Sequence, residues 1–198
     1  MKTHVKRLLL IIVFTVFFLS FLLLLFYFIQ VANKKTALQG SAFQSQIVST
    51  VSLGLPVRLI IPVINVNAII QNLGVTTKGE LEVPSNATNV GWFKLGPRPG
   101  ERGSAVIAGH FDGENGEAGV FTNLNKLKKG DKLYIKDARG KTIPFVVRES
   151  RIYDPGYAND VFSGSGSAYL NLITCDGVWD GAIKSYSKRL VVFADIVH

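Results

Sequence analysis

The feature that most constrains this chain is an uninterrupted apolar run close to its beginning. From Leu8 to Ile29 the sequence reads LLLIIVFTVFFLSFLLLLFYFI, in which only Thr15 and Ser20 are polar and no residue is charged. At about 1.5 Å per residue, a helix over this run is roughly 33 Å long, enough to cross a hydrocarbon core of about 30 Å. The run also lacks the polar face of a surface helix. We therefore expect a transmembrane helix over residues 8–29.

The residues around this run predict its orientation. Lys2, Lys6 and Arg7 precede it with no acidic residue among them, so the positive-inside rule places residues 1–7 in the cytoplasm and the remainder outside the membrane. A cleaved signal peptide is the alternative, although its apolar core is only about 7–15 residues long and Val31-Ala32 is a poor match to its small-residue cleavage site. We expect a retained anchor and a single-pass protein of the cell membrane.

Beyond the apolar run the chain divides into a linker and one domain. Residues 30–56 are rich in Ala, Gln, Ser, Thr and Gly without a clear period, which is typical of an extracytoplasmic stalk. The domain is expected over residues 57–198. Five of the 22 Lys and Arg residues, and none of the 14 acidic residues, lie within residues 1–35, so the rest of the chain carries a net charge of only +3. That balance, without a basic run interleaved with aromatics, argues against nucleic-acid binding.

Short apolar, β-branched runs separated by polar turns dominate the predicted domain. Such runs are typical of antiparallel strands in a sandwich or closed barrel, so we expect an all-β fold with short helical inserts. The eight strand candidates are RLIIPVINV, NAIIQNLGVT, GELEVP, SAVIAGHF, KLYIKD, TIPFVVRESRIY, YLNLITC and RLVVFADIV. Short helices are expected around Gly91 to Leu95, Val120 to Leu127 and Ala158 to Phe162. Pro62 and Pro144 are expected at strand edges or bulges.

Three residues are the candidates for chemistry. Cys175 is the only cysteine, so no disulfide forms within the chain, and it ends the run YLNLITC before the turn pair Asp176-Gly177. His110 ends the run SAVIAGH and is the only histidine away from the chain termini, and Arg189 opens the last predicted strand. A thiol and an imidazole at the ends of strands can act as nucleophile and acid–base group, with a guanidinium available to a developing oxyanion.

Each of these residues also has a plain structural interpretation. A lone Cys in a β-rich domain is often a small buried hydrophobe, a His beside a turn is often structural, and an Arg is ordinarily a surface charge. The combination is more informative than its members, because the thiolate is the attacking form and a nearby His or Arg lowers the pKa of a thiol.

The order of these motifs resembles the sortase family. The resemblance covers roughly residues 57–196 and rests on AGH at 108–110, LITC at 172–175 and Arg189 fourteen residues after the cysteine. The run GHFDGENGEAGVFTNLNKLKKGD, with its F-x-x-L-x-x-L-x-x-G-D pattern, is similar to the class F branch, and classes D and A are the alternatives. The family motif T-L-x-T-C opens with Thr where this chain has Asn171, a difference that bears on the class more than on the chemistry.

The resemblance implies an eight-stranded sortase barrel whose catalytic residues are His110, Cys175 and Arg189, with Thr174 assisting substrate binding in the same pocket. The implied activity is cysteine transpeptidation: the thiolate cleaves an LPXTG-like sorting signal of a surface protein at the Thr–Gly bond through a thioester. An amine from a lipid-linked peptidoglycan precursor or a pilin lysine then resolves the thioester. The family's Cys–His pair is expected to be mostly neutral at rest.

Other sites and activities are less well supported by the sequence. The spacing of Asp112, Glu114 and Glu117 does not match an EF-hand loop, and one Cys with one internal His cannot form an ordinary zinc site, so neither a metal nor a cofactor is expected. Two alternatives remain to sortase activity. One is a non-catalytic, membrane-anchored binding module on a sortase-like barrel, and the other is an L,D-type cysteine transpeptidase of the cell wall.

Overall fold

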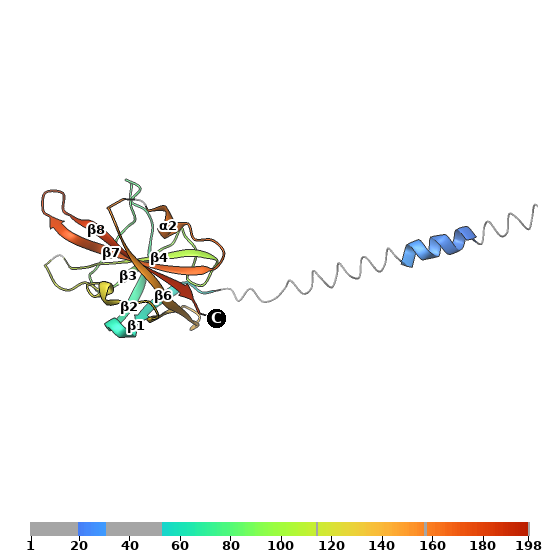
Figure 1. The fold of residues 1–198 in the computed structure, drawn as a ribbon, viewed down its shortest axis with the longest axis horizontal. Helices are drawn as coiled ribbons and strands as arrows, with labels where there is room; N and C mark the ends of the chain where they lie inside the picture. Colours follow the sequence, from blue (N-terminus) through green and yellow to red (C-terminus); the bar gives the residue numbers. More distant parts are fainter. Residues whose placement is uncertain (1–19, 31–52, 114, 157, 198) are drawn as a thin grey trace, which may run out of the picture. The chain divides into compact units, whose positions relative to one another are not determined.

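The computed structural model describes residues 20–30, 53–113, 115–156 and 158–197 of the chain (Figure 1). The chain divides into two units, Met1–Ser52 and Leu53–His198. In the first unit, residues 20–30 form a helix whose side chains are all exposed. No helix among the described residues is both long and apolar enough to cross a membrane. Residues 1–19 and most of the predicted stalk lie outside the described residues, so the predicted span 8–29 stays a prediction.

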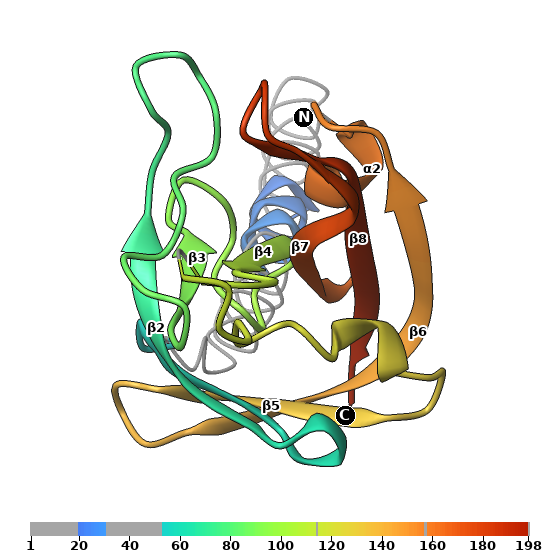
Figure 2. The same cartoon turned by 90° about the vertical axis from the view of Figure 1, so that its left-hand side faces the viewer.

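The second unit is a closed barrel of eight strands in the order β1-β2-β3-β4-β7-β8-β6-β5 (Figure 2). Most neighbours are antiparallel, but β2 and β3 run parallel, as do β4 and β7. The fold class expected from the sequence is confirmed for this unit. The strands are β1 (Pro56–Ile61), β2 (Val66–Leu73), β3 (Val90–Phe93), β4 (Gly103–Gly109), β5 (Lys132–Asp137), β6 (Thr142–Tyr153), β7 (Ala168–Asp180) and β8 (Ser185–Ile196).

Three short helices connect the strands in the described part of this unit. They are the 3-10 helices η1 (Pro62–Ile64) and η2 (Leu124–Lys126), and the α-helix α2 (Asn159–Phe162). The predicted turn at Ala158 to Phe162 is confirmed by α2, and only part of the predicted helix at Val120 to Leu127 is helical, as η2.

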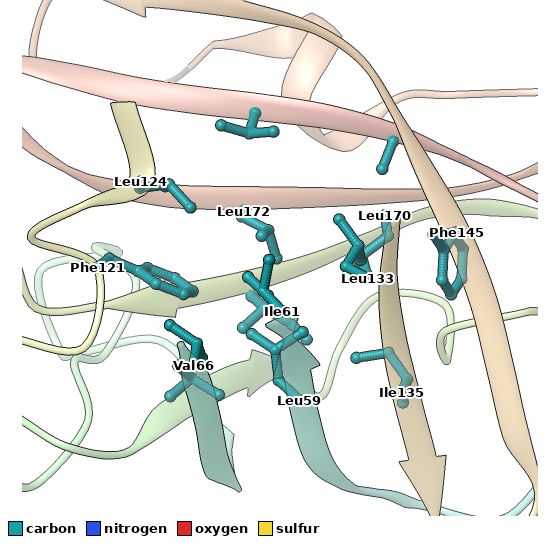
Figure 3. Close-up of a cluster of buried hydrophobic side chains, with 14 of the residues drawn as sticks. Leu59, Ile61, Val66, Phe121, Leu124, Leu133, Ile135, Phe145, Leu170 and Leu172 are labelled. Carbon is teal, nitrogen blue, oxygen red and sulfur yellow. The ribbon is translucent and has the colours of Figure 1, made fainter. Parts of the chain in front are cut away.

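Apolar side chains fill the barrel, because alternate residues of each strand point inward. The interior cluster includes Leu59 and Ile61 from β1 and Leu170 and Leu172 from β7, all fully buried, with Phe121 closing one side from the segment that leads into η2 (Figure 3). A second, smaller cluster lies on the outer side of the barrel wall, where α2 packs on β4 and β8. It consists of Val106, Val161, Val191 and Phe193.

Two expected elements differ from the structure. The run GELEVP forms no strand beyond an isolated bridge between Val75 and Leu81, because its polar groups close local turns: the Glu82 carboxylate accepts a hydrogen bond from the Gly74 amide at 2.6 Å. The segment from Gly91 to Leu95 is not helical, since its first residues belong to β3. A Cβ on Gly91 would lie 2.1 Å from Leu73 Cδ1, so glycine permits the close approach of β3 to β2.

The two prolines also lie in unexpected places. Pro62 begins η1 after the last residue of β1, rather than lying within a strand. Pro144 sits inside β6 opposite Tyr134, away from the bulge between Val147 and Glu149. A closed barrel has no edge strand at which a proline could avoid pairing. Pro144 is tolerated because it lacks only the amide donor, while its carbonyl still accepts a hydrogen bond from Val197 N at 3.0 Å.

Candidate active site

Three adjacent strands bring the predicted residues Cys175, Arg189 and His110 to one level of the barrel. Cys175 of β7 lies directly opposite Arg189 of β8 in their antiparallel ladder. On the other side of β7, the parallel register pairs Ala108 with Ile173, and continuing it by two residues sets His110 beside Cys175. Neighbouring strands lie about 4.8 Å apart, so the cysteine is flanked closely by the other two residues.

The alternation of side chains along β7 and β8 places Cys175 and Arg189 on the outer face of the barrel. Leu172 belongs to the interior cluster, whereas Ile173 packs against the outer cluster, and Cys175 shares the face of Ile173. Val191 is likewise part of the outer cluster, so Arg189, two residues before it, points the same way. The half-buried thiol is therefore accessible from outside the barrel.

Two strand boundaries differ from the sequence interpretation. Cys175 does not end its strand, because β7 continues to Asp180, and β8 begins at Ser185 before it reaches Arg189. The pair Asp176-Gly177 forms an irregularity in the ladder instead of a turn, with Gly177 at φ +83°. The strands thus extend beyond the cysteine as a hairpin.

His110 follows directly on β4 and is held by a backbone carbonyl. Its Nε2 lies 2.8 Å from the Pro84 oxygen, and it shares the outward face of Val106 by strand alternation. A carbonyl oxygen can only accept, so Nε2 carries a proton, and in the neutral ring Nδ1 is the nitrogen that accepts one. This contact therefore leaves Nδ1 as the atom that exchanges a proton during chemistry.

Thr174 is buried and connects the two strands that carry the cysteine and the histidine. Its hydroxyl donates a hydrogen bond of 2.9 Å to the carbonyl of Gly109, the residue before His110. The bond extends the β4–β7 pairing by one position beyond Ala108. Thr174 therefore supports the relative placement of His110 and Cys175 from the inner side of the wall.

The electrostatic surroundings of Cys175 keep its thiol protonated. Burial raises the pKa of the thiol, the negative charge of Asp112 raises it further, and the positive charge of Arg189 opposes both. The net shift is upward, so the neutral thiol is the resting form at physiological pH. The family expectation of a mostly neutral Cys–His pair agrees with this direction for the cysteine.

Arg189 is held in place by the hairpin. Its Nη1 donates to the carbonyls of Tyr186 at 2.9 Å and Lys188 at 2.8 Å, and its Nη2 donates to Ser185 Oγ at 3.1 Å. No carboxylate of the described residues forms an ion pair with it, so its charge acts on the cysteine without being neutralised locally.

Two further residues at this site were not identified from the sequence as functional. The Tyr186 hydroxyl donates a hydrogen bond to the Asp112 carboxylate, and the Tyr186 ring packs edge-on against Phe111 with centroids 5.6 Å apart. The hydrogen bond to Asp112 raises the pKa of Tyr186 to about 12. The signal in the sequence was that Asp112 follows His110 by two residues.

The outer face also carries a pocket near the beginnings of β4 and β7. It has a volume of about 260 Å³ and is lined by Ser104, Arg148, Asp160, Gly164, Ser165, Tyr169, Asn171 and Phe193. The buried Asn171 side chain donates a 2.6 Å hydrogen bond to the Val161 carbonyl of α2. Asn171 precedes Cys175 by four residues, which is about 13 Å along a strand.

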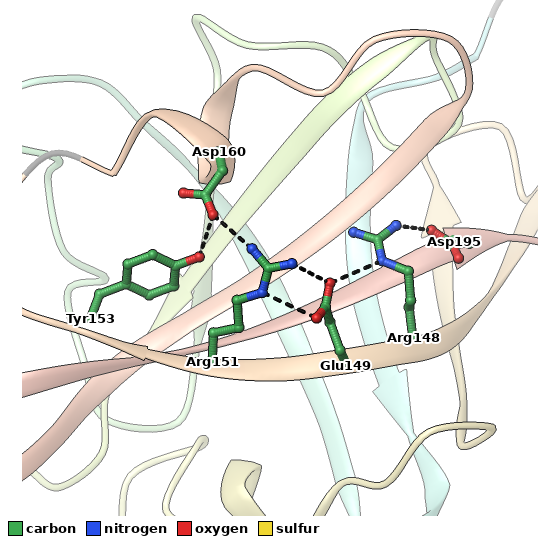
Figure 4. Close-up of polar contacts among 6 residues, drawn as sticks. All are labelled: Arg148, Glu149, Arg151, Tyr153, Asp160 and Asp195. Carbon is green, nitrogen blue, oxygen red and sulfur yellow. Dashed lines mark hydrogen bonds and ion pairs between the residues drawn. The ribbon is translucent and has the colours of Figure 1, made fainter.

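An ionic network fastens α2 at the edge of this pocket (Figure 4). Arg151 of β6 contacts Glu149 at 2.7 Å and Asp160 of α2 at 3.0 Å. The Tyr153 hydroxyl donates to the same Asp160 carboxylate at 2.5 Å. The hydrogen bond from Arg151 holds the pKa of Glu149 below its usual value. These contacts and Asn171 together hold α2 over the outer face.

The sequence offered Asp112, Glu114 and Glu117 as the residues to weigh as metal ligands. Within residues 20–30, 53–113, 115–156 and 158–197, no group of three or more His, Cys, Asp or Glu side chains could hold a metal ion. Glu114 itself lies outside the described residues.

Comparison with protein families and curated proteins gives two matches. The model of the Sortase domain matches residues 59–197 of this chain. The chain is also 32% identical over 96 residues to Sortase A of Bacillus anthracis. That alignment covers 48% of this chain and 41% of the relative, so the chain matches about two fifths of the relative's length.

Solved structures with similar folds come from several bacteria. Sortase C-1 from Actinomyces oris superposes with a TM-score of 0.58 at 26% identity, over 79% of this chain and 81% of that one. A pilus-related sortase C of Group B Streptococcus gives a TM-score of 0.57 at 25% identity, over 74% and 69% of the two chains. Sortase C from Clostridium perfringens SM101, at 21% identity, TM-score 0.54 and coverages of 74% and 72%, shows likeness of fold alone.

Proposed function

Because the chain belongs to the sortase family of cysteine transpeptidases, we propose that it cleaves an LPXTG-like sorting signal at the Thr–Gly bond and transfers the acyl part to an amine. The observation that carries the proposal is the placement of His110, Cys175 and Arg189 at one level of β4, β7 and β8, on the outer face of the barrel. That arrangement supplies a nucleophile that has a proton carrier one strand spacing away on one side and a fixed positive charge one strand spacing away on the other.

The acylation step follows from the protonation states at the site. The Cys175 thiol is neutral at rest, so it must give its proton to His110 Nδ1 as its sulfur attacks the Thr carbonyl carbon. The Arg189 guanidinium stabilises the negative charge that develops on the sulfur or the carbonyl oxygen. The imidazolium then protonates the departing Gly nitrogen, the C–N bond breaks, and a thioester to Cys175 remains.

The second step reverses these roles. A neutral amine attacks the thioester carbon, a C–N bond forms, and the C–S bond breaks. The amine nitrogen loses a proton to His110 as it attacks, and the thiolate of Cys175 then recovers a proton, which restores the starting enzyme. Water attacking in place of the amine gives hydrolysis.

The position of the pocket on the outer face supports a substrate with the four residues of an LPXT segment before the scissile bond. The pocket begins about 13 Å from the cysteine, which is the span of about four residues of extended chain. The residues of an LPXT segment that precede the scissile bond cover this distance when they lie along β7. Asn171 and Thr174 belong to the strand over which such a segment would pass.

The proposed partners require a location at the membrane. We propose that residues 8–29 anchor the chain with its N-terminus in the cytoplasm and its barrel outside, near surface proteins that carry sorting signals. The exposed apolar side chains of residues 20–30 support this, since they form a helix without a polar face. An anchor holds enzyme, substrate tail and a lipid-linked precursor or pilin lysine in one plane, which raises their effective concentration.

A class F-like assignment is part of the proposal. It is supported by the pattern that contains Phe121, Leu124, Leu127, Gly130 and Asp131, because its three apolar members are buried against the barrel core. Its Gly130 has φ +97°, and its Asp131 accepts a hydrogen bond from Lys128 N at 2.8 Å. The pattern thus forms a defined connection into β5.

The function is tested with the full chain in detergent, an LPXTG peptide and triglycine, followed by mass spectrometry. We expect cleavage after Thr, a triglycine-linked product and an acyl-enzyme on Cys175, all lost in Cys175→Ala. If no peptide of a sorting-motif panel reacts while Cys175 is readily alkylated, the result favours another transpeptidase activity of this cysteine, such as the L,D type. If the thiol is also inert to alkylation, a non-catalytic binding module is the better description.

A further inference from the structure

A contact between Asp112 and Tyr186 joins the segment that follows His110 to the hairpin of β7 and β8. Asp112 lies two residues after His110, and Tyr186 lies three residues before Arg189, so the contact joins the neighbours of both catalytic candidates. The Tyr186 hydroxyl donates to Asp112 Oδ2, and Phe111 packs edge-on against the Tyr186 ring. Arg189 in turn donates to the Tyr186 carbonyl at 2.9 Å.

This arrangement brings a negative charge to the cysteine. Asp112 is close enough to Cys175 for its charge to raise the pKa of the thiol, and Tyr186 also responds to both groups. A carboxylate in this position is a disadvantage for the first step, because it disfavours the thiolate. We therefore look for the role of Asp112 in the second step, in which the amine attacks the thioester.

The Asp112 carboxylate is also available to bind a cation. Among the described residues, no Lys, Arg or His side chain forms an ion pair with it, in contrast to Asp160, which is paired with Arg151. Tyr186 occupies Oδ2 only, and its pKa of about 12 keeps the hydroxyl protonated, so it acts purely as a donor there. A half-buried carboxylate oriented in this way binds an ammonium group more strongly than an exposed one.

We propose that Asp112 binds the ammonium group of the acyl acceptor, with Tyr186 positioning the carboxylate. The inference rests on the proposed function and names how that site recognises its second substrate. An amine acceptor arrives protonated at neutral pH and must lose one proton before its nitrogen can attack. Asp112 holds the cation beside the thioester and passes that proton to solvent. The attacking nitrogen then gives its second proton to His110, the new C–N bond replaces the C–S bond, and His110 returns the proton to the Cys175 thiolate.

The test compares two acceptors that differ in charge. The amino group of triglycine is mainly protonated at pH 7, whereas hydroxylamine is mainly neutral. The full chain is acylated with the LPXTG peptide, and the ratio of amine transfer to hydrolysis is measured against acceptor concentration. For Asp112→Asn we expect a loss of about tenfold in this ratio with triglycine, equivalent to about 1.4 kcal/mol of transition-state stabilisation. With hydroxylamine we expect little change.

Matched variants separate charge recognition from general damage. Asp176→Asn removes an equal charge one residue from Cys175, and this variant should keep the ratio of the unsubstituted protein. Asp112→Glu retains the carboxylate and should keep a preference for triglycine. Tyr186→Phe should raise the triglycine concentration needed for half-maximal transfer, while leaving the hydroxylamine reaction unchanged.

The outcomes are distinguishable. Acyl-enzyme formation with an unchanged triglycine ratio in Asp112→Asn, or an equal loss with both acceptors, overturns the role of Asp112 and leaves the proposed function standing. Failure of the unsubstituted protein to form any acyl-enzyme overturns the proposed function and this inference together.

Discussion

Cys175 and Arg189 lie directly opposite each other in the antiparallel ladder between β7 and β8. The cysteine is also influenced by Asp112, so its thiol lies between a positive and a negative charge while burial raises its pKa. The balance of these effects, rather than any one of them, determines how much thiolate is present.

Alkylation of Cys175 by iodoacetamide should become faster with increasing pH and should not level off until the pH exceeds the usual pKa of a cysteine, because the pKa is raised. Arg189→Gln removes the lowering influence, so alkylation at pH 8 should slow. Asp112→Asn removes a raising influence, so alkylation at pH 8 should become faster. Rate profiles from pH 6 to pH 10 measure both changes. A shift of the two variants in the same direction would contradict the proposed electrostatics.

His110→Gln should abolish most peptide cleavage, because the ring nitrogen that takes and returns the proton is lost. General acid–base catalysis contributes about 10²–10⁴-fold, so the acylation rate should fall by that order. The measurement is single-turnover formation of the acyl-enzyme. Cys175 should still react with iodoacetamide at pH 10, where no proton carrier is needed. A variant with nearly full acylation would exclude His110 from this role.

Thr174→Val should destabilise the barrel and weaken catalysis together. The substitution removes the hydroxyl that bonds the Gly109 carbonyl at 2.9 Å and leaves that buried oxygen without this donor. A buried polar group left unsatisfied costs about 1–3 kcal/mol in unfolding free energy. Thr174→Ser keeps the hydroxyl and serves as the control. Urea unfolding of the two variants measures the difference, which should be absent if the hydrogen bond is unimportant.

Asp137 should make the barrel sensitive to acid. Burial raises the pKa of this carboxyl, but hydrogen bonds from the amides of Gly54, Lys141 and Arg139 outweigh burial and lower it below its ordinary value. A group with a lowered pKa in the folded state stabilises that state above its unfolded-state pKa and loses this effect as the pH falls. The unfolding free energy should therefore decrease below about pH 4.

Asp137→Asn provides the control for this acid sensitivity. The variant should be less stable than the unsubstituted protein at pH 7, and the difference should shrink as the pH is lowered towards 3. Urea unfolding at each pH measures both proteins. A difference that stays constant with pH would show that the carboxylate charge is not the source of the stabilisation.

The strands that build the site could be read from the sequence because their patterns are long. The runs ending at His110 and Cys175 contain enough β-branched residues to indicate strands, and the barrel confirms them as parts of β4 and β7. The four-residue strand β3 is too short to show a period, and its pairing with β2 decides its conformation. The turn pair Asp176-Gly177 was misleading, since the same residues permit an irregularity inside a longer hairpin.

The polar contacts of the site could not be derived from sequence in the same way. Asp112 and Tyr186 are 74 residues apart, and only the closed barrel brings them together. The same holds for the Pro84 carbonyl that orients His110, because Pro84 ends the run GELEVP, which was expected to be a strand but forms only an isolated bridge. Residue identities thus indicated the nucleophile and its partners. The groups that contact these partners and orient them, such as Tyr186 and the Pro84 carbonyl, are brought to the site only by the tertiary structure.

The parallel pairing of β4 with β7 has a consequence for when the protein can react. β5 and β6 lie between these two strands in the chain, so the pairing can form only after most of the domain has been synthesised and folded. Until then the single thiol lacks its proton acceptor His110, even if the local β7–β8 hairpin has already set Arg189 beside it. A nascent or partly unfolded molecule therefore carries a dormant cysteine, and completion of the barrel acts as the maturation step that makes the enzyme competent.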